Sequence, residues 1–328
     1  RGCHPIISHK MVKILIADAM AEEGRKALAA AGHEITFNAG LGADDMAGAI
    51  GDHEVLIVRS TKVQRPCIEA ATHLKMIIRA GAAVNTIDGA AATEKGIAVC
   101  NTPGKNSAAV AELTVGMLIA ADRQIVSMTN DLRAGQWRKK HYAKCQGLNG
   151  RVYGVIGNGP IAQKVVAAVK TLGMKVVQSS RSFTEEKAAA AGVTYAASPL
   201  EVAKQAYALS IHLPLTPNLK HLINKEFLDA MAPGSIVINT SRGGHHDTAA
   251  VKEAIKEKGI RFALDVYENE PTKHAGCPFE DTELAEMCAV CCQHTGASTL
   301  EAQDAVANEV LTMVAEYCNG NVMHRTNA

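Results

Sequence analysis

Short apolar, β-branched runs alternate with helix-like segments along the chain, and this pattern constrains the fold more than any other feature. Strands that alternate with helices are typical of βαβ units, in which helices cover both faces of a parallel sheet. The runs form two series, so we expect an α/β protein with two doubly wound parallel-sheet domains. The first series comprises residues 12–18, 54–60, 75–81 and 97–104, and the second comprises residues 151–157, 175–180, 208–215, 235–242, 261–267 and 287–293.

The segments outside the two series are also informative. Between the series, apolar periodicity predicts one long helix from Asn106 to about Ala134, which Asn106 and Ser107 can cap. A basic loop follows over residues 137–144, and a closing helix is expected over residues 298–318.

Length, charge and hydropathy exclude several classes of protein. A chain of 328 residues with 47% hydrophobic residues can form two domains with sizeable cores. A formal net charge of +1 gives no global support for a nucleic-acid partner. No apolar run approaches the roughly 18–20 residues of a membrane span, so we expect no membrane partner. Because Met11 opens the first strand-like run, we expect residues 1–10 to be a disordered extension.

Residues 288–299, with the sequence CAVCCQHTGAST, place three cysteines and His294 close together. Two interpretations compete: a soft-metal cluster, or a buried strand followed by a catalytic histidine. In a strand, Cys291 and Cys292 point to opposite faces, and no second CxxC pair supplies further ligands, so we expect no metal site. The nine cysteines are odd in number and follow no repeating framework, which indicates reduced thiols and a cytoplasmic location.

A glycine-rich turn at the start of the second series predicts a dinucleotide site. Gly157-x-Gly159-x-x-Ala162 follows a strand and opens a helix. The first glycine permits a tight turn, the second lets the backbone approach a pyrophosphate, and the alanine allows close helix–strand packing. The helix N-terminus would then hold the pyrophosphate. The alternative is an ordinary βα turn.

An ordered set of motifs runs along the chain: VRSTKV (58–63), RAGAAVNTID (79–88), NTPGKNSAAVAELTVGML (101–118), LNGRVYGVIGNGPIA (148–162), HLPLTPNLKHLIN (212–224), INTSRGG (238–244), LDVYENEP (264–271) and HTGASTLEAQ (294–303). This set resembles the D-isomer-specific 2-hydroxyacid dehydrogenase family, in particular its phosphoglycerate dehydrogenase branch. The resemblance implies a Rossmann-type dinucleotide domain over residues 105–295. It also implies a flavodoxin-like substrate domain over residues 11–104 plus 296–328, with the active site in the cleft. The helix from Asn106 would build a homodimer interface, and the chain would lack the C-terminal regulatory domain of longer relatives.

The resemblance implies a catalytic trio of Arg242, Glu270 and His294. The arginine would recognise the substrate carboxylate and polarise the carbonyl. His294 would be the general acid in reduction and the general base in oxidation, and Glu270 would orient its ring and stabilise the imidazolium. Glu268 and Glu280 are solvated alternatives to Glu270. The family usually has threonine–proline before the histidine, where this chain has Cys292 and Gln293, so a constraint on the His294 loop is lost and Cys292 is open to oxidation.

The cofactor would be NAD or NADP. NAD-specific members carry an acidic residue at the end of the second strand, about 20 residues after the glycine turn. This chain has Ser180 and Arg181 there, so no carboxylate repels a 2′-phosphate. The implied cofactor-binding residues are Gly157, Gly159, Pro160, Ile161, Ser180, Arg181, His212, Pro214, Thr240, Ser241, Asp265 and Gly296.

The implied substrate is a small phosphorylated 2-hydroxy acid. Arg59 matches the phosphate-contacting arginine of phosphoglycerate dehydrogenases, and the basic loop residues 138–140 would reach a neighbouring subunit's site or form a solvated charge run. Ala83-Val84-Asn85 replaces the family's usual Gly-Val-Asp in the loop that holds the carboxylate. The implied substrate-binding residues are Arg59, Ser60, Lys62, Ala82, Ala83 and Asn106.

Three functions stay open. The first is NAD(P)-dependent oxidation of D-3-phosphoglycerate to 3-phosphohydroxypyruvate, which opens serine biosynthesis. The second is a hydroxypyruvate or glyoxylate reductase, suggested by Ser180 and Arg181. The third is a non-catalytic dinucleotide-sensing scaffold that resembles the family's corepressors, against which the intact catalytic trio argues.

Overall fold

The computed structural model describes residues 10–271 and 277–327, which form two compact units. The terminal unit combines the chain up to Asn106 with the chain from Ser298 onward, and the central unit comprises Ser107–Ala297. The sequence placed both domain boundaries two residues earlier, at 104/105 and 295/296. The expected disordered extension, residues 1–10, lies outside the described residues except for Lys10.

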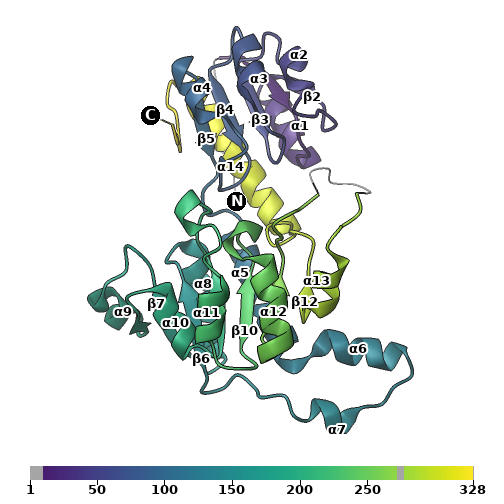
Figure 1. Cartoon of the computed structure of the whole chain (residues 1–328). Coiled ribbons are helices and arrows are strands. Elements are labelled where there is room, and N and C mark those ends of the chain that lie inside the picture. The colour runs from purple at the N-terminus through teal and green to yellow at the C-terminus, as the bar shows by residue number, and fades with distance from the viewer. Residues whose placement is uncertain (1–9, 272–276, 328) are drawn as a thin grey trace. The chain divides into compact units, whose positions relative to one another are not determined.

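The terminal unit is built on a five-stranded parallel sheet (Figure 1). The strand order β2-β1-β3-β4-β5 is the flavodoxin-like order that was expected. In sequence order the strands are β1 (Lys13–Ile16), β2 (Glu34–Phe37), β3 (Val55–Val58), β4 (Met76–Arg79) and β5 (Ala98–Asn101). The helices are α1 (Glu22–Ala30), α2 (Met46–Ala49), α3 (Arg65–Ala70), α4 (Gly89–Glu94) and α14 (Leu300–Cys318).

Alternating side chains of this sheet pack into two cores. Ile14 and Ile16 pack with the buried residues of α1 and α14, whereas Leu15 packs with those of α2, α3 and α4. The inner strands β1, β3 and β4 are therefore apolar except for Lys13 and Arg79 at strand ends, as expected for a sheet that is covered on both faces. All paired strands run parallel, so their carboxyl ends lie at one edge of the sheet.

The central unit holds a seven-stranded parallel sheet in the order β12-β11-β10-β9-β6-β7-β8 (Figure 1). The six strands from β11 to β8 follow the Rossmann order, and β12 is added beside β11 at one edge of the sheet. The strands are β6 (Val152–Ile156), β7 (Lys175–Ser179), β8 (Thr194–Tyr195), β9 (Ala208–Ile211), β10 (Ile236–Asn239), β11 (Arg261–Leu264) and β12 (Val290–Cys291). The helices are α5 (Ser107–Arg123), α6 (Ile125–Arg133), α7 (Lys139–Tyr142), α8 (Pro160–Thr171), α9 (Glu185–Ala191), α10 (Pro199–Gln205), α11 (Lys225–Ala230), α12 (Thr248–Lys258) and α13 (Thr282–Met287), with short 3₁₀ turns η1 (Pro217–Leu219) and η2 (Gly243–His245).

Two helical layers cover this sheet. On β10, Ile236 and Ile238 pack with α5 and α8, whereas Val237 packs with α10, α11 and α12. The strand order reverses between β6 and β9, and ligands of doubly wound folds bind at such a switch point, outside the carboxyl ends of the strands. None of the helices in the described parts of the chain is long and apolar enough to cross a membrane.

The expected single helix from Asn106 to about Ala134 is wrong. Gln124 has a φ of 55°, which interrupts the helical ladder and divides the segment into α5 and α6. No residue of α6 is buried, so core packing does not hold it in line with α5. The expected cap, Asn106, instead has a buried side-chain oxygen without a hydrogen-bond partner among the described residues.

Two other local expectations need correction. The basic loop contains the short helix α7, and Asp131 fixes its ends by pairing with Arg138 at 3.3 Å and accepting a 2.6 Å hydrogen bond from the Tyr142 hydroxyl.

The expected strand over residues 287–293 is only Val290–Cys291, because residues before it form α13, whose first turn Asp281 caps. This strand lies at the sheet edge, and Cys291 is exposed rather than buried.

Candidate active site

His294 and Glu270 form a hydrogen-bonded pair in the central unit. The Nδ1 atom of His294 lies 2.7 Å from Oε2 of Glu270, and the other carboxylate oxygen accepts a 2.9 Å hydrogen bond from the Tyr267 N–H. The His294 side chain is 46% exposed, so its second ring nitrogen is open to a ligand. Burial alone would raise the pKa of Glu270, but the hydrogen bond and charge of His294, the Tyr267 N–H and the charge of Arg242 together lower it. A carboxylate that stays ionised can fix one tautomer of the imidazole.

The backbone places His294 on a constrained turn. Its φ is 54°, and its N–H donates a 2.7 Å hydrogen bond to the Asp265 carbonyl oxygen. The buried carboxylate of Asp265 then accepts hydrogen bonds from the N–H groups of Thr295 and Gly296, at 2.8 and 2.9 Å. Burial raises the pKa of Asp265, although both N–H groups oppose the shift. Asp265 was expected to bind the cofactor, and in this structure it also fixes the loop of the histidine.

Arg242 follows β10 in a turn that a buried asparagine organises. Asn239 accepts hydrogen bonds from the N–H and hydroxyl of Ser241, and its amide nitrogen donates to the Arg242 carbonyl oxygen at 2.9 Å. A Cβ on Gly243 would lie 1.9 Å from the Tyr267 carbonyl, so this position requires glycine. Burial lowers the pKa of Arg242 and the Glu270 charge opposes that, but a guanidinium remains charged at neutral pH. The carboxylate of Glu270 thus contacts His294 and interacts electrostatically with the Arg242 guanidinium.

The turn between β6 and α8 has the geometry of a pyrophosphate site. Gly157 has a φ of 119°, and a Cβ there would lie 2.4 Å from the His212 carbonyl oxygen, which places the turn beside the end of β9. A Cβ on Gly159 would have no atom within 4 Å among the described residues, and no side chain caps α8. The first N–H groups of α8 are therefore accessible to an anion. The sequence missed Gln178, whose buried amide donates a 2.7 Å hydrogen bond to the Gly157 carbonyl oxygen.

Ser180 and Arg181 directly follow β7, where the sequence placed the ribose-recognition position. Ser180 is partly buried and Arg181 is exposed. The neighbouring strand ends supply the other expected cofactor residues. His212 is partly buried, with Nε2 2.8 Å from the Ser210 hydroxyl, and burial lowers its pKa to about 4. Thr240 is buried, and its hydroxyl lies 2.9 Å from that of Thr114. The Ser241 hydroxyl donates a hydrogen bond to Asn239. Of the remaining expected cofactor residues, Gly296 is buried, Ile161 is partly buried, and Pro160 and Pro214 are exposed.

The expected substrate residues lie in the terminal unit, after the ends of β3 and β4. Asp18, which the sequence analysis missed, follows β1 and accepts hydrogen bonds from the N–H groups of Arg59, Ser60 and Thr61 at 2.7 to 3.0 Å. The guanidinium of Arg59 donates a 3.3 Å hydrogen bond to the Ser298 hydroxyl. The sequence could have indicated this contact, because Asp18 comes shortly after β1, and β1 is the neighbour of β3 in the sheet. The carboxyl ends of parallel strands meet at one edge, so residues that follow β1 and β3 lie close together.

The remaining expected substrate residues provide exposed groups. Lys62 is exposed at the end of the same loop. In the loop after β4, Ala82 is exposed and Ala83 is partly buried, and within the described residues neither N–H donates a hydrogen bond. These two N–H groups can donate hydrogen bonds to the carboxylate oxygens of a ligand.

A second histidine–glutamate pair corrects the expectation that Glu268 is solvated. Its carboxylate lies 2.6 Å from Nε2 of His221 and accepts hydrogen bonds from the N–H and hydroxyl of Thr248, at 3.0 and 2.6 Å. Burial would raise the pKa of Glu268, but these contacts lower it. Glu268 therefore anchors the start of α12, whereas Glu280 is exposed as expected.

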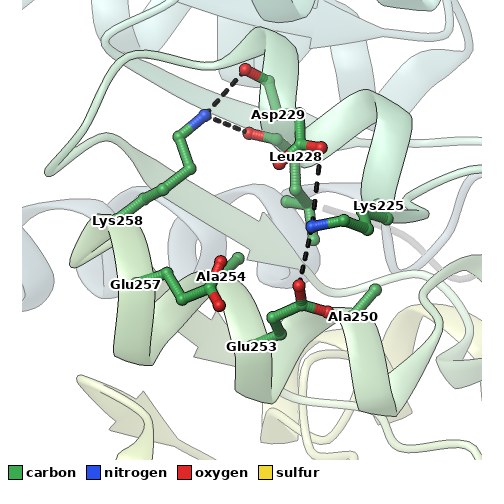
Figure 2. A pocket seen from close by; sticks show the side chains of 8 residues that line it. All are labelled: Lys225, Leu228, Asp229, Ala250, Glu253, Ala254, Glu257 and Lys258. Carbon is green, nitrogen blue, oxygen red and sulfur yellow. Dashed lines mark hydrogen bonds and ion pairs between the residues drawn. The ribbon is translucent and has the colours of Figure 1, made fainter.

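Two further features carry no ligand assignment. Within the described ranges, no group of three or more His, Cys, Asp or Glu residues is placed to hold a metal ion. Figure 2 shows a small pocket between α11 and α12. There Lys225 pairs with Glu253 at 2.7 Å, and Lys258 donates to the carbonyl oxygens of Leu228 and Asp229. Both lysines of this pocket therefore already have partners within the protein.

Comparison with known proteins identifies the family. Residues 115–293 match the family described as D-isomer specific 2-hydroxyacid dehydrogenase, NAD binding domain. A D-3-phosphoglycerate dehydrogenase of Methanocaldococcus jannaschii is 40% identical over 315 residues, which cover 95% of this chain and 58% of that protein. A hydroxypyruvate reductase of Thermotoga maritima is 36% identical over 282 residues, 83% of this chain and 87% of that protein. The structure of NAD⁺-bound 3-phosphoglycerate dehydrogenase from Entamoeba histolytica matches with a TM-score of 0.80 and 25% identity, over 97% of this chain and 99% of that chain.

The chain belongs to the D-isomer specific 2-hydroxyacid dehydrogenase family, which confirms the resemblance read from its motifs. The two-sheet α/β fold and the NAD(P) class of cofactor are confirmed with it. The chain spans 57–58% of the length of the D-3-phosphoglycerate dehydrogenases of Methanocaldococcus jannaschii and Rattus norvegicus that it matches.

Proposed function

We propose that this chain catalyses the NAD(P)-dependent oxidation of D-3-phosphoglycerate to 3-phosphohydroxypyruvate, the first step of serine biosynthesis. The His294–Glu270 pair carries the proposal, because a histidine whose Nδ1 has a fixed anionic partner can exchange a proton at Nε2. Similarity to D-3-phosphoglycerate dehydrogenases at 33–40% identity supports the substrate.

Each group of the trio has a distinct role in this proposal. Nε2 of His294 takes the proton of the C2 hydroxyl during oxidation and returns it to the carbonyl oxygen during reduction. Glu270 stabilises the imidazolium that forms, and Arg242 binds the substrate carboxylate through its fork of N–H groups. Bound NAD(P) supplies the nicotinamide that exchanges a hydride with C2. The turn at Gly157 and Gly159 would hold its pyrophosphate at the N-terminus of α8.

Substrate choice would depend on the terminal unit. Arg59 would bind the 3-phosphate, with its backbone fixed by Asp18, and Ser60 and Lys62 would assist. The N–H groups of Ala82 and Ala83 would hold the carboxylate. Asn106 has a buried oxygen without a partner among the described residues, which a substrate hydroxyl could satisfy.

A hydroxypyruvate or glyoxylate reductase is the second candidate. The Thermotoga maritima hydroxypyruvate reductase supports it, because this chain covers 87% of that protein's length. Steady-state reduction of phosphohydroxypyruvate, hydroxypyruvate and glyoxylate, each with NADH and with NADPH, tests both candidates. A clear preference in kcat/KM for phosphohydroxypyruvate supports the first function, and equal or better use of the unphosphorylated acids overturns it.

We also propose a homodimer. The exposed large apolar side chains of the central unit include Ile125, Val126 and Leu132 of α6, and Trp137 is 78% exposed just beyond it. In Figure 1, α6 and α7 extend away from the sheet of the central unit, so packing within that unit leaves them uncovered. A second copy would cover this apolar surface. Sedimentation of the wild type against a Leu132→Glu variant tests the proposal, and a monomeric wild type would overturn it.

A further inference from the structure

We propose that Cys288 and Cys291 form a thiol–disulfide switch whose oxidation perturbs the loop that carries His294. The proposed function uses neither of these cysteines. The predicted effect on turnover rests on the proposed function, whereas the disulfide itself can be tested without any activity.

The fold brings the two thiols together. Helix α13 ends at Met287, Cys288 follows as its C-terminal cap, and β12 begins two residues later. The chain bends between them, so Sγ of Cys291 lies 3.6 Å from the Ala285 carbonyl oxygen in α13. Cys288 caps the same helix, and its side chain lies against that of Cys291. Cys291 is exposed and Cys288 is partly buried, so an oxidant can reach the first sulfur while the second lies behind it.

The two thiols have different reactivities. The hydrogen bond from Cys288 lowers the pKa of Cys291 to about 7, with Tyr267 adding to the effect and burial opposing it. The same hydrogen bond, together with burial, raises the pKa of Cys288. Burial also raises the pKa of Cys292. Because the thiolate is the nucleophile, Cys291 is the attacking residue and Cys288 is the resolving residue.

The oxidant is a small disulfide such as oxidised glutathione. The Cys291 thiolate attacks one sulfur of this disulfide, forms a mixed disulfide and releases one glutathione thiolate. The Cys288 sulfur gives up its proton to a glutathione thiolate and attacks the Cys291 sulfur, which expels the second glutathione. The protein is oxidised by two electrons, and one oxidised glutathione is reduced to two thiols.

Tyr267 connects this pair to the candidate active site. Its side chain lies against the Cys291 sulfur, and its hydroxyl donates hydrogen bonds to the carbonyl oxygens of Leu264 and Cys292, at 3.1 and 2.8 Å. Its backbone N–H donates to Glu270, the partner of His294. A bond from Cys291 to Cys288 draws that sulfur away from the tyrosine and moves a strand end only three residues before His294. General acid–base catalysis depends on that position.

The test combines peptide mapping with turnover. The full chain is incubated with oxidised glutathione at neutral pH, mapped by mass spectrometry without reduction, and assayed before and after dithiothreitol. We expect a Cys288–Cys291 disulfide, a fall in kcat of about tenfold or more, and recovery on reduction. Cys291→Ser and Cys288→Ser should each retain the activity of the reduced enzyme and resist this loss. Cys277→Ser, an exposed thiol outside the pair, should behave as the wild type.

Each other outcome is decisive. Absence of the Cys288–Cys291 disulfide, or modification of Cys292 alone, overturns the proposal. A disulfide that forms without changing kcat overturns its connection to His294. If the reduced chain reduces none of the 2-oxo acids, the proposed function fails. The effect on the loop is then decided by whether the disulfide changes the NMR titration of His294.

Discussion

Glu270 contributes to the candidate site through two oxygens with different partners. The Tyr267 N–H holds Oε1, so Oε2 is directed to Nδ1 of His294. A carboxylate held at both oxygens cannot turn away from the ring to solvent. The consequence is that Nε2, and not Nδ1, is the atom available to a substrate.

At this scale we predict that His294→Ala lowers kcat by roughly 10²–10⁴-fold, the usual size of general acid–base catalysis. Dinucleotide affinity should change little, because the glycine turn and α8 lie elsewhere in the unit. Steady-state kinetics and cofactor titration by fluorescence measure the two effects. His73→Ala is the control, since His73 is exposed and lies outside the site. A variant with near-wild-type kcat would remove His294 from the mechanism.

Glu270→Gln should preserve the shape of the site and change its pH dependence. Reduction requires the imidazolium, which loses its anionic partner in this variant. The pH–rate profile for reduction should move to lower pH. The measurement is kcat/KM across the accessible pH range, and an unchanged profile would contradict the assigned role.

Arg59→Ala should separate phosphorylated from unphosphorylated substrates. A charged hydrogen bond to phosphate contributes about 1.5–3 kcal/mol, so KM for phosphohydroxypyruvate should rise about 10–150-fold. Activity on hydroxypyruvate should be nearly unchanged. Arg65→Ala is a matched control, because Arg65 is a nearby exposed arginine that pairs with Glu94 at 2.7 Å. Equal losses on both substrates would make Arg59 a structural residue.

At the scale of elements, the sequence predicted the strands that are buried on both faces, missed β2 and β8, and placed the edge strand β12 with bounds that were too wide. Both β3 and β10 are fully buried, and their residues are apolar except for Asn239 at the end of β10. In contrast, the edge strand β2 is mainly exposed, and β8 has only two residues. Short exposed strands carry no continuous apolar run. The break at Gln124 was also missed, because helical periodicity continues through a single left-handed residue.

The end of β7 gives a prediction about cofactor choice. Since Ser180 and Arg181 occupy the place of the NAD-selecting acid, NADH and NADPH should give kcat/KM values within about tenfold, or roughly 1.4 kcal/mol. Ser180→Asp should shift the preference toward NADH by repelling the 2′-phosphate, and Arg181→Ala should weaken NADPH more than NADH. The assays need low ionic strength, because salt screens the phosphate charge. A thousandfold preference of the wild type for NADH would show that the ribose is recognised elsewhere.

Across the whole molecule, sequence motifs predicted the candidate site where each functional residue follows a strand. Arg242, Glu270 and His294 all come after strand ends of one sheet, so a parallel topology gathers them. The supporting residues were missed because their contacts join distant parts of the chain. Asp18 binds a loop 41–43 residues away, and Gln178 bonds a turn 21 residues before it. No local pattern identifies such partners.

Stability against acid should depend on a histidine that the fold buries in its neutral form. His246 is 1% exposed, and its Nδ1 accepts a 3.1 Å hydrogen bond from the Asn239 amide. Burial lowers the pKa of His246 to about 4, whereas the unfolded chain has the ordinary value of 6.5. As pH falls below that value the unfolded chain binds a proton that the folded chain does not, so the free energy of unfolding decreases.

We therefore predict that His246 alone costs about 2 kcal/mol of stability between about pH 7 and about pH 5. The contribution is fully present above the unfolded pKa and is lost as pH falls toward the folded pKa. In His246→Gln, which cannot titrate, the loss over this range should be smaller by that amount. Because the chain has two compact units and His246 lies in one of them, amide exchange of peptides that contain β10 is the appropriate measurement. His73→Gln, at an exposed site, should retain the wild-type pH dependence. If His246→Gln also retains it, the neutral buried imidazole does not control the acid stability of the central unit.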